Sequence, residues 1–163
     1  VDLNAGKAVA EGVELEFQSR VTENLQVDLS ASYGETTLSG DSSIGSDGDN
    51  LPGSSDFNAT LGIQYDFSLA SNSSFARIDY SYISEYFNSV GSGTGQTPAG
   101  GFGQLNLKVG TQFDQVSADI FVDNLTNNDG LTWVESVFSG ATGIVRANQI
   151  RPRTIGLNLR YQF

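Results

Sequence analysis

Apolar and polar residues alternate with a period of two along most of the chain. In GVELEFQSRV (12–21), Val13, Leu15 and Phe17 share one side, whereas Glu14 and Glu16 lie on the other. Six further segments repeat this alternation, at residues 25–33, 57–69, 75–87, 103–113, 116–122 and 153–163. Because successive side chains of a β-strand point to opposite faces, the pattern predicts about seven strands, each with an apolar and a polar face. Apolar spacing of three and four is not sustained anywhere, so no helix of note is expected.

The connections between these segments alternate between short and long. The short ones are TENLQ, ASNSS and DQ, and the long ones span residues 34–56, 89–101 and 125–150. Greek-key sandwiches show no such regularity, whereas an up-and-down meander with short turns at one end and long loops at the other is typical of transmembrane β-barrels. The predicted fold is therefore all-β, an antiparallel up-and-down transmembrane β-barrel segment.

Alternation alone does not distinguish a half-buried soluble sheet from a sheet whose apolar face contacts lipid. Three observations favour lipid. Segments such as 57–69 exceed the 5–6 residues typical of soluble strands and are long enough to cross a membrane. Aromatic residues gather at both ends of the segments, as headgroup-level girdles do. The opposite face is rich in polar and charged residues, which a wet lumen tolerates; they include Asp28, Asp66, Arg77, Asp79, Lys108, Asp119 and Arg160.

Sidedness follows from the loop lengths. Short turns are expected on the periplasmic side and long loops outside, so the last strand places Phe163 in the periplasm. Seven strands is an odd number, whereas bacterial barrels have an even number with both ends periplasmic. At least one rising strand is therefore expected before Val1, with Val1–Leu3 as its remnant.

Composition excludes several classes of function. The formal net charge of -11 argues against nucleic-acid binding, which needs Lys and Arg to neutralise phosphates. The chain contains no His and no Cys, so it holds neither a His-based catalytic triad nor a Cys/His metal site. We expect a protein that is not an enzyme and that carries no cofactor.

Three stretches resemble one family when they are read in series. NAGKAVAEGVELE (4–16) resembles the Asn-x-Gly and Gly-Val-Glu-Leu-Glu pattern late in TonB-dependent outer-membrane receptors. FVDNLTN (121–127) is similar to their Asn-Leu-Thr-Asn/Asp motif at the top of the penultimate strand. RPRTIGLNLRYQF (151–163) resembles their final strand, a Pro-Arg element followed by alternation to a terminal Phe.

The resemblance implies that residues 1–163 are the C-terminal portion of a 22-strand barrel, without its plug domain and earlier strands. Such receptors import scarce ligands of siderophore, cobalamin or glycan type across the Gram-negative outer membrane, and TonB would act only through the missing N-terminal part. Outer-membrane lipid, the barrel assembly machinery and a small extracellular ligand are the other implied partners. Two alternatives stay open: a complete small outer-membrane barrel acting as adhesin or pore, and a soluble β-sandwich that binds carbohydrate.

Two sets of residues are candidate sites. The last long loop holds the only Trp of the chain. In this loop, Trp133, Phe138 and Arg146 are predicted to contact ligand. The alternative is that the loop packs over the barrel mouth or extends a strand. The terminal strand, through Leu157, Leu159, Tyr161 and Phe163, resembles the signal read by the barrel assembly machinery.

Glu14 and Glu16 are interpreted as lumen-facing residues rather than paired catalytic acids. GSDGDN (45–50) is interpreted as an acidic surface loop rather than a calcium site, because it lacks the closing Glu of an EF-hand.

Overall fold

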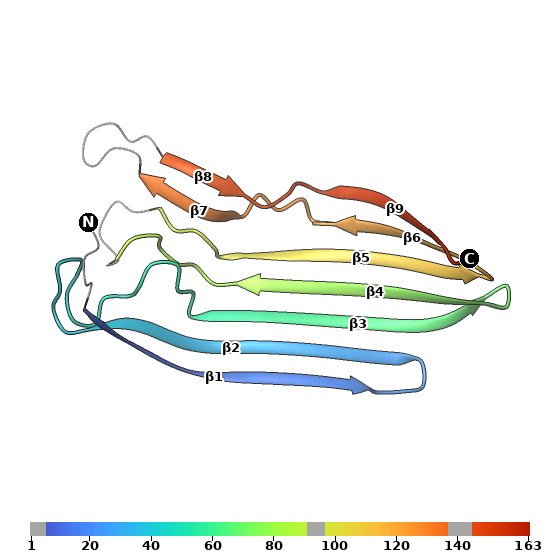
Figure 1. The fold of residues 1–163 in the computed structure, drawn as a ribbon, viewed down its shortest axis with the longest axis horizontal. Helices are drawn as coiled ribbons and strands as arrows, with labels where there is room; N and C mark the ends of the chain where they lie inside the picture. Colours follow the sequence, from blue (N-terminus) through green and yellow to red (C-terminus); the bar gives the residue numbers. More distant parts are fainter. Residues whose placement is uncertain (1–5, 91–96, 137–144) are drawn as a thin grey trace.

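The computed structural model describes residues 6–90, 97–136 and 145–163, and these residues form β-strands joined by turns and loops (Figure 1). The strands are β1 (Lys7–Arg20), β2 (Leu25–Ser39), β3 (Phe57–Leu69), β4 (Asn72–Ile83), β5 (Phe102–Phe113), β6 (Val116–Asp123), β7 (Leu131–Ser136), β8 (Val145–Gln149) and β9 (Thr154–Tyr161). The all-β prediction is confirmed.

Seven of the strands form one antiparallel sheet in the order β1-β2-β3-β4-β5-β6-β9. Each strand pairs with the next one along the sheet, which is the predicted up-and-down meander, and β1 and β9 occupy the two edges. Figure 1 shows the short turns and Phe163 at one end of the sheet and the long connections at the other. The predicted strands at 57–69, 103–113 and 116–122 agree with β3, β5 and β6 to within a residue at either end.

Several boundaries differ from the prediction. β1 begins at Lys7 rather than residue 12, and β9 ends at Tyr161 rather than residue 163. β2 continues to Ser39, through residues assigned to a loop, because its ladder with β1 runs on from Tyr33↔Val13 to Ser39↔Lys7. β4 begins at Asn72 rather than residue 75, so its turn with β3 contains only Ala70 and Ser71, both at positive φ. The strand β4 also ends at Ile83, before the predicted end at residue 87. These segments carry polar residues without an apolar period, so alternation does not reveal their ends.

The last long connection contains two strands that alternation did not predict. β7 and β8 form a separate antiparallel hairpin with a register shift between Leu131 and Trp133. Part of this connection therefore extends away from the sheet as a ribbon, in agreement with the alternative interpretation that it forms a strand extension (Figure 1). The Val1–Leu3 remnant of an earlier strand lies outside the described residues.

The buried apolar residues of the described chain lie among the long connections rather than in the central sheet. They are Leu38 near the end of β2, Ala99 before β5, and Val134 in β7, which are 3%, 1% and 6% exposed. On the apolar face of the sheet, by contrast, large side chains such as Val13 and Ile120 are 72% and 58% exposed. The sheet is thus one layer with no second sheet on its apolar face among the described residues, which does not support the β-sandwich alternative.

Aromatic rings cover glycines on neighbouring strands in the second half of the sheet. On the polar face, the ring of Phe75 in β4 lies against Gly110 in β5, and the ring of Phe121 in β6 lies against Gly156 in β9. In both pairs the two residues are directly opposite in the register. A Cβ at either glycine would meet the ring, so these strands need glycine for the aromatic side chain to lie flat across the partner strand.

Candidate functional site

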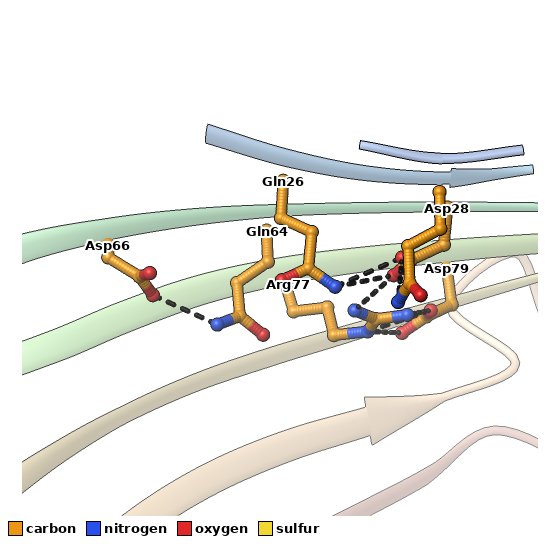
Figure 2. A network of polar contacts seen from close by, with 7 residues as sticks. Gln26, Asp28, Gln64, Asp66, Arg77 and Asp79 are labelled. Atoms are coloured by element: carbon orange, nitrogen blue, oxygen red, sulfur yellow. Dashed lines mark hydrogen bonds and ion pairs between the residues drawn. The ribbon is translucent and has the colours of Figure 1, made fainter. Parts of the chain in front are cut away.

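The polar face of the sheet carries a network of polar and charged side chains from β1, β2 and β4. Arg77 donates from Nε and Nη2 to the carboxylate of Asp79, two residues along β4, with the shortest distance 2.7 Å. Its Nη1 reaches Asp28 Oδ2 on β2 at 3.1 Å. Gln18 and Gln26 also donate to Asp28, each at 3.0 Å. Figure 2 shows Arg77 between the two carboxylates.

Gly62 makes this long-range ion pair possible. It is the residue of β3 that lies directly between Asp28 and Asp79 in the register. A Cβ at Gly62 would meet the Arg77 guanidinium and would lie 3.0 Å from Asp79 Oδ1. The missing side chain therefore leaves the passage through which Arg77 crosses β3 to reach Asp28.

A second charged group lies on the same face over β5, β6 and β9. Lys108 Nζ is 3.5 Å from Asp119 Oδ2, and that oxygen also accepts a hydrogen bond of 2.8 Å from Asn158 Nδ2. Two depressions follow the polar face, of about 570 Å³ around Asp28 and Arg77 and about 370 Å³ around Lys108 and Phe121. The polar face is thus hollowed and carries ion-paired and hydrogen-bonded side chains in both depressions.

Glu14 and Glu16 are both exposed on the polar side of the edge strand β1, in register with Ser32 and Ser30. No second carboxylate of the described residues lies directly across from either one. This placement agrees with their interpretation as polar wall residues. Among the described residues, no group of three or more His, Cys, Asp or Glu side chains could hold a metal ion.

The acidic segment 45–50 uses its carboxylates to stabilise its own loop. Asp47 Oδ1 accepts the Gly40 amide at 2.6 Å, and Asp49 Oδ2 accepts the Ser46 amide at 2.8 Å. The Asp47 amide in turn donates to Asp41 Oδ1 at 3.1 Å. These contacts resemble ordinary side-chain-to-backbone turns. They agree with the interpretation of this segment as an acidic surface loop.

Asn124 joins two of the sequence motifs that carry the family resemblance. Its side chain is buried, with 1% exposure, and its φ is 51°. The amide Nδ2 donates to the carbonyls of Asn128 and Arg151 at 2.8 and 3.0 Å, and Oδ1 accepts the Asn128 amide at 2.9 Å. Asn127 Oδ1 accepts the amide of Arg153. We call residues 124–128 with 151–153 the Asn124 knot; it fixes the start of β9 beside the end of β6.

The predicted ligand-contact residues are partly brought together. Trp133 in β7 pairs with Asn148 in β8, and Glu135 pairs with Arg146, so all four share one face of the hairpin. Trp133 is 36% exposed and Arg146 is exposed. Phe138, the third predicted residue, lies outside the described residues.

The predicted assembly-signal residues lie on the apolar side of the final strand and beyond it. Leu157, Leu159 and Tyr161 are 60%, 68% and 58% exposed, and Phe163 is fully exposed. The rings of Tyr161 and Phe163 are 6.2 Å apart, and Tyr161 Oη donates to Gln115 Oε1 at 2.7 Å. The segment is therefore an apolar, aromatic strand end beside a short turn.

The family model for TonB-dependent receptor-like β-barrels matches residues 2–125. The chain belongs to this family. The match covers most of the chain, and the family is one of outer-membrane receptors and transporters. No curated protein matches the chain. Within the described ranges, no helix is long and apolar enough to cross a membrane.

Two solved structures share the fold of this receptor barrel segment. The ferric yersiniabactin uptake receptor FyuA from Yersinia pestis is 23% identical and superposes with a TM-score of 0.85 over 98% of this chain. The copper transporter OprC is 20% identical, with a TM-score of 0.68 over 96% of this chain. The chain spans 24% of the length of each of these proteins.

Sequence reasoning placed Asp28, Arg77 and Asp79 on the polar face but did not predict that they interact. The spacing of Arg77 and Asp79 is visible in the sequence, whereas the contact with Asp28 depends on the register of three strands. The glycine at position 62 was the one available signal, because it interrupts the polar side of a long strand.

Proposed function

We propose that residues 1–163 form the C-terminal part of a larger, 22-strand receptor barrel that takes up a small extracellular ligand across the Gram-negative outer membrane. The observation that carries the proposal is the seven-stranded antiparallel sheet with an exposed apolar face and a hollowed polar face, in a chain of this family. Both edge strands lack a partner among the described residues, and neighbouring barrel strands would complete their hydrogen bonding.

The apolar face is suited to contact with lipid. Ile155, Leu157 and Leu159 are 60–70% exposed, and burying such side chains in hydrocarbon is worth about 1.5–3 kcal/mol each. Lipid supplies this burial without a second protein layer. The C-terminus then lies in the periplasm, and the exposed end Leu157–Phe163 is available to the barrel assembly machinery during insertion.

Energised uptake would be a property of the whole receptor. TonB and a plug domain would act through an N-terminal part, whereas this segment supplies wall, outer connections and ligand contacts. The ligand is of siderophore, cobalamin or glycan type, and the hairpin face with Trp133 and Arg146 contacts it. An exposed indole can stack on a ligand, and a guanidinium on the same face of the hairpin can hydrogen-bond to its polar edge.

The test uses the full-length receptor in cells with and without TonB. Uptake of radiolabelled ferric siderophores, cobalamin and oligosaccharides is measured, and the accumulated probe is expected to depend on TonB. For that probe, Trp133→Ala is expected to weaken binding at least tenfold, a loss of about 1.4 kcal/mol. The matched control is Glu23→Ala in the short β1–β2 turn, which should leave affinity unchanged. Unchanged affinity in Trp133→Ala would show that the hairpin is not part of the ligand site. Uptake at the same rate with and without TonB would contradict the transport proposal.

A further inference from the structure

The β7–β8 hairpin is held at two places. Its base is the junction with β6 and β9, and its flank is the side that contacts the β4–β5 connection. At the base, the Asn124 knot fixes residues 124–128 and 151–153 through buried side-chain hydrogen bonds. Asn128 Oδ1 also accepts the Gly130 amide at 2.8 Å, and Ile150 donates to the Gly130 carbonyl at 2.9 Å. The base is therefore tied to the sheet by several short contacts.

The flank is held by far fewer contacts. The Tyr86 hydroxyl donates to the Thr132 carbonyl at 2.6 Å, and the Gly100 amide donates to the Leu131 carbonyl at 2.8 Å. Among the described residues, the Tyr86 phenol makes the one side-chain hydrogen bond between the β4–β5 connection and the hairpin. Both acceptors are carbonyls near the start of β7, in or beside the register shift between Leu131 and Trp133.

The donors of these two bonds are positioned by a tight return of the chain. Tyr86 and Ala99 exchange backbone hydrogen bonds of 2.9 Å each way, which sets Gly100 directly beside the start of the hairpin. Gly100 has φ 76°, and a Cβ there would collide with the Ser84 carbonyl. Only glycine fits this turn, so the Gly100 amide can reach Leu131 at no steric cost.

The same connection is bonded to the opposite outer loop. The Gly53 amide donates to the Phe87 carbonyl at 2.8 Å, and Ser84 and Phe57 exchange two hydrogen bonds of 2.8 and 3.0 Å. Residues 84–87 and 97–101 thus lie between the β2–β3 loop and the hairpin and contact both. The β2–β3 loop and the hairpin are therefore joined through this connection by a short series of hydrogen bonds.

We infer that Tyr86 is a latch that positions the hairpin. When the Tyr86–Thr132 bond opens, the flank keeps only the Gly100–Leu131 hydrogen bond, and the hairpin loosens about its Asn124 base while the sheet keeps its register. Because Phe87 is the next residue, the same opening loosens the contact with Gly53, so the hairpin and the β2–β3 loop respond together. Tyr86 acts here as a positioning residue. The inference concerns how the hairpin is held, and it stands whatever ligand the receptor takes.

Hydrogen exchange of the full-length receptor in detergent tests the latch. Tyr86→Phe removes only the hydroxyl, so the fold is retained. The loss of one hydrogen bond is expected to raise amide exchange in β7 and β8 about two- to tenfold, with a smaller rise at Gly53. Amides of β6 and of the Asn124 knot should exchange at the wild-type rate.

The matched control is Tyr33→Phe, which removes the same atom from a phenol that is 58% exposed on the apolar face and makes no hydrogen bond among the described residues. It should leave hairpin exchange unchanged. Wild-type exchange in the Tyr86→Phe hairpin would overturn the latch. Equal acceleration in the Asn124 knot would also overturn it, because the whole connection would then be melting rather than opening at the flank. An unchanged rate at Gly53 beside a faster hairpin would overturn the coupling between the two loops.

Discussion

At the scale of single residues, the polar face shows how an absent side chain can organise a charged network. Gly62 is the point where Arg77 crosses β3, and Asp28 and Asp79 lie directly on either side of it. The alternation of the sequence assigns these residues to a face. Their pairing follows from the relative offset of three strands, which one sequence does not encode in any local pattern, so the ion pair could not be predicted.

Gly62→Ala is expected to weaken the Arg77–Asp28 pair and leave the strand intact, because the new methyl meets the mobile end of Arg77 rather than backbone. The coupling free energy between Asp28→Asn and Arg77→Gln, measured from unfolding in detergent, should be small and favourable in the native background, because both side chains are partly exposed to solvent. It should fall close to zero with Ala at position 62. An equal coupling in both backgrounds would show that Arg77 does not need this passage.

At the scale of elements, alternation predicted the strands that have one apolar and one polar side along their whole length. The final strand, predicted at 153–163, is observed as β9 because Ile155, Leu157 and Leu159 mark every second position. The hairpin strands and the outer end of β2 were missed because they lie beyond the apolar band. There the chain forms strands through backbone pairing and a small buried core with Val134, which period-two hydrophobicity does not report.

The Asn124 knot is expected to stabilise the junction of β6, β7 and β9. Replacing Asn124 by Gly removes the side-chain bonds to Asn128 and Arg151 and keeps a residue that tolerates φ 51°. We expect a loss of about 1–3 kcal/mol of unfolding free energy. Asn124→Ala should be worse by a further 1–2 kcal/mol or so, because alanine is strained in the left-handed region. Chemical denaturation of the full-length receptor measures both, and equal stability of the two variants would contradict the backbone argument.

At the scale of the whole molecule, the distribution of exposed side chains favours an environment that is apolar on one side of the sheet and aqueous on the other. The described core is confined to the long connections, while the sheet exposes large apolar side chains on one face and charges on the other. A chain in water would hide the first face against another layer. The fold class was accessible from sequence because every strand of the sheet repeats the same alternation of apolar and polar residues.

Cysteine labelling in intact cells tests the proposed orientation. Ile44→Cys, in the long β2–β3 loop, should react with a membrane-impermeant maleimide from outside. Ile120→Cys is the matched control: Ile120 is 58% exposed against 41% for Ile44, yet lipid should protect it. Asn72→Cys, beside the two-residue β3–β4 turn, should react only after the outer membrane is permeabilised. Labelling of Asn72→Cys in intact cells would reverse the orientation.

The aromatic rings that cover Gly110 and Gly156 have a consequence for how the strands find their partners. A slip of one residue between strands exchanges the apolar and polar faces and is penalised along the whole strand. A slip of two residues preserves both faces, so the hydrophobic pattern does not detect it. That slip would place Phe121 opposite Asn158 or Thr154, where a side chain occupies the space that Gly156 leaves free. The two ring–glycine pairs therefore disfavour register slips of two residues, which the alternation of apolar and polar side chains does not penalise.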